Sequence, residues 1–162
     1  MRWTSDAGYP AAIRRSPVAG ALCGYVGVPP EHPYHGKDWQ TLELGVQPHG
    51  GLTYGGPLEN LVEVAWWLGF DCGHAFDYMP ALEALLHAIR APKYWAHHAA
   101  HGPPLPLAPF QGLGGTYRHL AYGKNETDTL ARELRAAAAG SAMMHAAIAA
   151  EPVTSEPEPR SP

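Results

Sequence analysis

The nearly continuous apolar stretch Leu61–Phe70 predicts the centre of the fold. A run of this kind is typical of a central strand that is buried on both faces of a sheet. Polar residues follow it at once, from Asp71 to Asp77. Because a rigid strand holds the residues at its end in place, strand ends are common positions for functional sites. The stretch therefore predicts a central strand with a candidate site beside it.

Further segments are predicted to be strands. Ala21–Val28 carries side chains that favour a pleated, half-buried surface, and Pro29 ends it because proline cannot donate to a ladder. Leu42–Val46 alternates apolar with other residues, which also indicates a strand. Leu52–Tyr54 is expected to continue a neighbouring strand.

Two helices are predicted in the second half of the chain. Pro80 suits the first turn of a helix, and the apolar spacing over Ala81–Ala91 continues it. A second helix is expected to begin at a cap, Asn125 or Thr127, and to reach Ala139. These elements predict a single α+β domain, in which two or three helices pack on a mixed or antiparallel sheet with long loops.

One domain over residues 20–140 suits the length of the chain, which supports a single sizeable core. Residues 1–19 lack periodicity and are predicted to form an irregular lead-in. Residues 92–115 are rich in proline, glycine and histidine, so we expect a long loop that serves as a lid, a variable insertion or a partly disordered segment. Residues 141–150 are alanine-rich and helix-competent, and residues 151–162 have the composition of a disordered tail.

Charge and cysteine content exclude several classes of protein. A formal net charge of −4 argues against non-specific nucleic-acid binding, which needs a basic surface. Cys23 and Cys72 are too few for a disulfide framework, and Met1–Asp6 lacks the apolar region of a signal peptide. No apolar run approaches the roughly 18–20 residues that span a bilayer. We therefore expect a cytoplasmic protein without a membrane partner, and the oligomeric state stays open.

Reactive side chains gather between Asp71 and Asp77. Cys72 beside His74 is a candidate nucleophile–base pair, because the thiolate is the reactive form of cysteine. A histidine flanked by carboxylates equally suits general acid–base catalysis near neutral pH. The structural alternative is that Cys72 is a small buried hydrophobic residue and that Asp71 caps a turn.

The glycine-rich loop that begins at His49 is a second candidate. Gly50 and Gly51 permit positive φ angles and close approach of a ligand to backbone N–H groups. Thr53 adds a hydroxyl, and the ring of Tyr54 suits stacking on a base. The loop matches neither the P-loop nor the GxGxxG pattern, and a plain hairpin turn is the alternative. We expect it to share one pocket with the histidine and aspartates that follow the central strand.

His35 and Lys37 extend the set of candidate ligand-binding residues. The cofactor stays unknown, but a divalent metal such as zinc or manganese is an alternative occupant of the site. His49, His74 and Asp77 supply suitable nitrogen and oxygen ligands. No HExxH motif and no CxxC pair supports a specific metal centre.

Charged side chains elsewhere in the chain are weaker candidates. Lys37, Arg118 and Lys124 are the cations most suited to meet an anionic ligand. Glu126 either completes an acid–base set or is an ordinary carboxylate in the first turn of a helix, and we favour the ordinary role.

Three motifs carry a resemblance to known proteins: GALCGYVGVP at Gly20–Pro29, HGGLTY at His49–Tyr54 and GFDCGHAFD at Gly69–Asp77. Over residues 20–135 the chain resembles a family of small uncharacterised proteins of tailed bacteriophages and prophage-like regions of bacterial genomes. The family has no established activity, so no residue role comes with it. The resemblance implies an accessory phage-type protein in the host cytoplasm, a small enzyme or an anti-defence factor.

The leading functional hypothesis is a small hydrolase that acts on a nucleotide or a phosphodiester. In it, His49 and His74 serve as acid–base or metal-ligating residues, Asp71 and Asp77 orient or ligate, and Cys72 is a lesser nucleophile candidate. One alternative is a non-catalytic protein that binds a small nucleotide signal and so counters host defence. Another is a protein–protein inhibitor.

Overall fold

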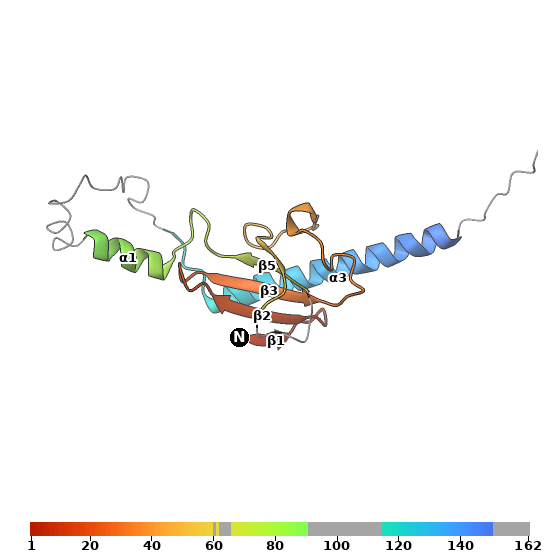
Figure 1. Cartoon of the computed structure of the whole chain (residues 1–162), viewed down its shortest axis with the longest axis horizontal. Coiled ribbons are helices and arrows are strands. Elements are labelled where there is room, and N and C mark those ends of the chain that lie inside the picture. The colour runs from red at the N-terminus through yellow and green to blue at the C-terminus, as the bar shows by residue number, and fades with distance from the viewer. Residues whose placement is uncertain (60, 62–65, 91–114, 151–162) are drawn as a thin grey trace, which may run out of the picture.

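The computed structural model describes residues 1–59, 61, 66–90 and 115–150. It contains a five-stranded antiparallel sheet in the order β1-β2-β3-β5-β4 (Figure 1). The strands are β1 (Arg2–Thr4), β2 (Pro10–Arg15), β3 (Leu22–Val28), β4 (Tyr54–Gly56) and β5 (Trp66–Asp71). The helices are α1 (Pro80–Arg90) and α3 (Leu120–Ala150), with a short 3-10 turn at Trp39–Thr41. The predicted single α+β domain is confirmed.

The core lies between one face of the sheet and the first half of α3. Val26 of β3 pairs with Leu68 of β5, and both are fully buried beneath Leu130 and Leu134 of the helix. Gly24 permits this close packing, because a Cβ atom there would collide with the side chain of Thr127 on α3 and with a phenyl ring of β5. The second half of α3 extends beyond the sheet (Figure 1).

The N-terminal prediction is wrong, because residues 1–19 are not an irregular lead-in. They contain β1 and β2, and β2 pairs with β1 on one side and with β3 on the other. Ala11, Ala12 and Ile13 are all buried, since this inner strand is covered on both faces. Such a strand shows no alternation of apolar and polar residues, which is why the sequence pattern did not reveal it.

The prediction for Leu42–Val46 is also wrong, because this segment forms no strand. Leu42 and Leu44 pack against the core from an irregular segment, so their spacing reflects burial without a ladder. The strand expected at Leu52–Tyr54 begins only at its last residue, as β4.

Ala21–Val28 and the apolar stretch before Asp71 do form strands, as β3 and β5. Residues 62–65 of that stretch lie outside the described part of the chain.

The helix predicted from Pro80 is confirmed as α1. The second helix begins earlier and ends later than expected, since α3 contains Asn125, Thr127 and Gly140 in its interior. Thr127 is no cap, because its hydroxyl donates to the carbonyl of Gly123 one turn before it, at 2.7 Å. The cost of an interior glycine, about 1 kcal/mol, does not break a helix that alanines continue on both sides.

Two predicted segments fall largely or wholly outside the part of the chain that the structure describes. Residues 92–114 of the long loop and the whole tail of residues 151–162 lie outside the described residues. Among the residues that are described, no helix combines the length and apolar character needed to cross a bilayer.

Candidate functional site

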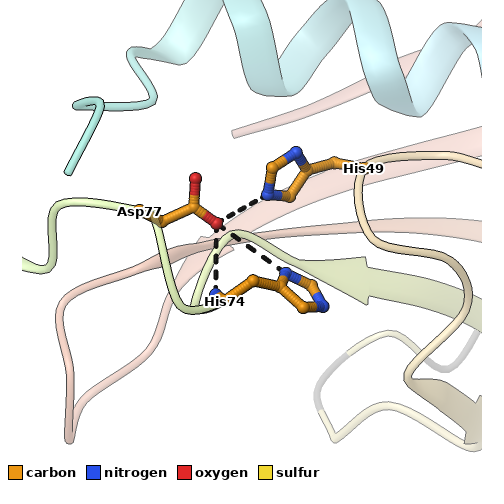
Figure 2. Close-up of side chains that lie close together, drawn as sticks. All are labelled: His49, His74 and Asp77. Carbon is orange, nitrogen blue, oxygen red and sulfur yellow. Dashed lines mark hydrogen bonds and ion pairs between the residues drawn. The ribbon is translucent and has the colours of Figure 1, made fainter. Parts of the chain in front are cut away.

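The candidate site forms where the chain turns after β5. The N–H of Asp77 donates to the carbonyl of His74 at 2.9 Å, which closes a turn. Asp77 also forms an isolated parallel β-bridge with Thr116, so a segment just before α3 holds it from the other side. Figure 2 shows the result: the side chains of His49, His74 and Asp77 meet beneath α3. Two segments far apart in the sequence therefore supply the cluster, and the segment around Thr116 supports it.

Asp77 is the centre of this cluster, and its side chain is only 2% exposed. Its Oδ2 atom accepts hydrogen bonds from His49 Nε2 at 2.6 Å and from the backbone N–H of His74 at 3.1 Å. Its Oδ1 atom accepts one from Arg118 Nε at 2.7 Å. Burial alone would raise the pKa of this carboxyl, but the bonds from Arg118, His49 and the His74 backbone outweigh burial and lower it. Asp77 is therefore a carboxylate at neutral pH.

His49 is bonded through both nitrogens of its ring. Its Nδ1 lies 2.9 Å from the hydroxyl of Tyr122, and its backbone N–H donates to a carboxylate oxygen of Glu126 at 2.9 Å. Burial and then the Glu126 charge raise the pKa of the Tyr122 hydroxyl, so this group stays protonated and donates to Nδ1. The ring hydrogen then resides on Nε2, where it donates to Asp77.

His74 differs from His49 because its ring lacks a complete set of partners. Its Nδ1 lies 3.7 Å from Asp77 Oδ2, which is too long for a hydrogen bond. This nitrogen is buried, and among the described residues it has no hydrogen-bond partner. The side chain as a whole is 39% exposed. His74 is therefore the histidine of the cluster that reaches solvent.

Gly50 allows the two histidine segments to approach each other. It has a φ of +66°, and a Cβ atom at this position would collide with the imidazole of His74. The rings of His49 and His74 can then pack edge to face, with centroids 5.2 Å apart. Gly51 also has a positive φ, +90°, and its N–H closes the turn by donating to the carbonyl of Pro48. The glycines serve the geometry of the loop.

Asp71 and Cys72 lie outside the cluster. Asp71 Oδ1 accepts the N–H of Gly73 at 2.9 Å, so this carboxylate caps a turn. Cys72 is 2% exposed, and burial and then the nearby Asp77 charge raise the pKa of its thiol to about 12. A protonated, buried thiol is a poor nucleophile. Both observations favour the structural alternatives for these two residues.

The other predicted ligand-binding residues lie away from the cluster. The N–H of Thr53 donates to the carbonyl of Gly69 on β5, and the ring of Tyr54 packs against Tyr25 with centroids 5.5 Å apart. His35 lies beside Trp66 at 6.0 Å between ring centroids. Lys37 is exposed. The His49 loop and the segment after β5 were expected to meet, and they do so through His49, His74 and Asp77, without these four residues.

A separate cavity of about 300 Å³ lies beside β1 and β2. Its walls are Arg2, Trp3, Thr4, Pro10, Ala11, Leu61 and Trp67. None of these residues belongs to the histidine–aspartate cluster, and none is a carboxylate or a histidine. The described residues that line the cavity therefore include no group suited to acid–base catalysis.

Further site residues come from the segment just before α3 and from the first turns of that helix. Arg118, one of the cations expected to meet an anionic ligand, lies before α3 and pairs with Asp77 through Nε. Glu126 was expected to be an ordinary first-turn carboxylate, but it lies beyond the first turn and holds the backbone of His49. Tyr122 was not identified at all. Tyr122 and Glu126 are four residues apart on α3 and so lie on one face of the helix, and this spacing was the available signal.

The chain matches no protein-family model, no curated protein and no solved structure.

Proposed function

We propose that the protein is a small hydrolase that cleaves a phosphate ester, with a nucleotide or a phosphodiester as the substrate class. The observation that supports this is the convergence of two imidazoles on one buried carboxylate oxygen: His49 Nε2 at 2.6 Å and His74 Nδ1 at 3.7 Å from Asp77 Oδ2. Side chains of these types can activate water near neutral pH.

Water would be activated on the solvent side of the cluster, next to His74. His49 has its two ring nitrogens bonded to Asp77 and Tyr122, so it holds Asp77 in place more than it faces solvent. The activated water would attack phosphorus, and the oxygen of the departing group would take up a proton. The buried carboxylate keeps its orientation because Arg118 occupies its other oxygen.

Arg118 is the group that favours an anionic substrate. Only its Nε is bonded to Asp77, and among the described residues its two terminal amino groups have no hydrogen bond. The guanidinium carbon lies 4.8 Å from the centre of the Tyr122 ring, and the side chain is 26% exposed. Terminal amino groups of arginine suit the geometry of phosphate oxygens. In a chain with a net charge of −4, such a local cation is needed to hold a phosphate.

The test is hydrolysis of a panel of nucleotides, dinucleotides and an aryl phosphodiester by the purified full chain. We expect turnover that His74→Ala and Asp77→Asn each reduce by about 100-fold or more, within the range of acid–base contributions. Asp6→Asn is the matched control, because Asp6 is exposed and outside the cluster. Circular dichroism shows that each variant is folded.

Two results would contradict a hydrolase. Recovery of an intact nucleotide from the denatured protein would favour the alternative of a nucleotide-sequestering binder. Full activity in both His74→Ala and Asp77→Asn would show that hydrolysis takes place outside the cluster. The phage-type resemblance extends the proposal: a nucleotide that carries a host defence signal is the substrate to try first.

A further inference from the structure

We infer that His49 Nε2, His74 Nδ1 and Asp77 Oδ2 bind one divalent first-row metal ion, zinc or manganese. The inference deepens the proposed function, because the ion would activate the attacking water. Binding of the metal can be measured without any assay of hydrolysis.

The distances between the ligand atoms suit a single ion. One ligand atom from each of the three side chains lies within 4.8 Å of the other two. An ion about 2.0–2.2 Å from each nitrogen and oxygen ligand sets those ligands roughly 3–3.5 Å apart. The contact of 2.6 Å between His49 and Asp77 would lengthen slightly, and the contact of 3.7 Å between His74 and Asp77 would shorten.

The unpartnered Nδ1 of His74 is the observation that points to an occupant. Buried polar atoms in folded proteins nearly always have a partner, and each exception calls for an explanation. This nitrogen faces Asp77 Oδ2, and no described residue donates to it or accepts from it. A metal ion between the two atoms would bond to both.

The residues around the cluster hold the ligands in orientations that suit a metal. Nδ1 of His49 lies 2.9 Å from the Tyr122 hydroxyl, so Nε2 of that ring is the atom turned toward Asp77. When the ion binds, the ring hydrogen would move from Nε2 to Nδ1 and be donated to the Tyr122 hydroxyl oxygen, which would free Nε2 to ligate. Arg118 bonds to Oδ1 of Asp77, which leaves Oδ2 for the ion. Metal-binding histidines and carboxylates usually have outer partners of this kind. The positive charge of Arg118 also repels the metal ion, so we expect the ion to bind reversibly and to exchange with solution.

The number of protein ligands fits a catalytic ion. Three side chains leave a coordination position open, as catalytic zinc sites do. A water in that position would lose one proton to solvent, because the ion lowers the pKa of bound water. Its oxygen would form a bond to phosphorus as the bond from phosphorus to the departing oxygen breaks, and that oxygen would take a proton from solvent. No electrons are exchanged.

The experiment is titration of the chelator-treated full chain with Zn²⁺, Mn²⁺ and Mg²⁺ by calorimetry, with bound metal counted by mass spectrometry. We expect one Zn²⁺ or Mn²⁺ per chain. Mg²⁺ should bind weakly, because it prefers oxygen ligands. His74→Ala and Asp77→Asn should each weaken binding by at least about tenfold, the effect that loss of even an outer partner has.

Two control variants separate the site from general histidine or carboxylate binding. His35→Ala removes another histidine with a buried, unpartnered ring nitrogen, but one outside the cluster. Asp6→Asn removes an exposed carboxylate. Both should bind the metal as the unchanged chain does. Because Asp77→Asn could unfold the chain, nuclear magnetic resonance of the ring nitrogens of His49 and His74 gives a second measurement on the unchanged protein. Their signals should shift on addition of zinc.

The outcomes distinguish this inference from the proposed hydrolysis. Absence of stoichiometric binding, or equal binding by all four variants, would overturn the metal site. Hydrolysis that survives complete removal of metal would overturn the role of the ion as water activator and leave the hydrolase intact. One bound zinc without turnover of any phosphate ester would support the metal site and contradict the hydrolase.

Discussion

Two histidine environments in this molecule have opposite characters. His32 is 5% exposed, and both ring nitrogens bond to backbone: Nε2 to the carbonyl of Leu134 at 2.9 Å and Nδ1 to the N–H of Tyr34 at 3.0 Å. In the cluster, His49 bonds to side chains, and His74 has a buried nitrogen without a partner among the described residues. A fully satisfied histidine joins parts of the fold, whereas an incompletely satisfied one beside a carboxylate is suited to chemistry.

The largest loss of activity should come from Asp77→Asn. The change removes the charge that His49 and Arg118 share, so activity on a phosphate ester should fall by about 100-fold or more. The measurement is kcat/KM against that of Asp6→Asn. An activity within twofold of the control would remove Asp77 from the proposed reaction.

The second largest loss of activity should come from a steric change at the cluster. Gly50→Ala places a methyl group against the His74 ring and forces an alanine into a φ of +66°, so activity should fall by about tenfold. Gly36→Ala is the matched control, because Gly36 has a φ of +73° and nothing within 4 Å of its added Cβ. The control should lose only about 1–2 kcal/mol of unfolding free energy from backbone strain. If the two variants lose equal activity, contact with His74 is not what matters.

His32→Gln should lower stability and leave activity unchanged. It disturbs two buried hydrogen bonds and should lower the free energy of unfolding by about 1–3 kcal/mol. Activity per folded molecule should stay unchanged, because His32 bonds to the backbone of α3 at Leu134 and is not part of the cluster. Urea unfolding and the phosphate-ester assay measure the two effects on one preparation. A specific loss of activity would show that the two environments are coupled.

The smallest effect should be a pH dependence of stability due to His32. Burial lowers its pKa below the ordinary value of 6.5, although the bond to Leu134 opposes the shift. Below pH 6.5 the unfolded chain therefore takes up this proton more readily than the folded chain, so stability falls as the pH decreases from there to the folded pKa. Above pH 6.5 the contribution is complete. Urea midpoints at several pH values should fall with acid, and His32→Gln should flatten the curve in this window.

Part of the candidate site could be predicted from the sequence, and part could not. His49, His74 and Asp77 could be identified because they follow a strong strand pattern or accompany adjacent glycines. Tyr122 on α3 could not, because its contact with His49 joins residues 73 positions apart. Local sequence patterns do not indicate which distant residues are in contact.

The same limit explains the errors in the fold. The inner strand β2 shows no alternation because both of its faces are covered, so residues 1–19 resembled a loop. Leu42 and Leu44 alternate with other residues although no strand forms there. For Cys72, the neighbouring histidine in the sequence suggested reactivity, but burial decides its chemistry.

Helix α3 carries both core residues and residues of the candidate site. Leu130 and Leu134 fix the helix on the sheet, and Tyr122 and Glu126 of the same helix hold His49. Because an α-helix rises about 1.5 Å per residue, a slip by one position would break both contacts to His49. Assembly of the cluster is thus thermodynamically linked to docking of the helix. A ligand that binds only the assembled cluster would raise the melting temperature of the whole domain.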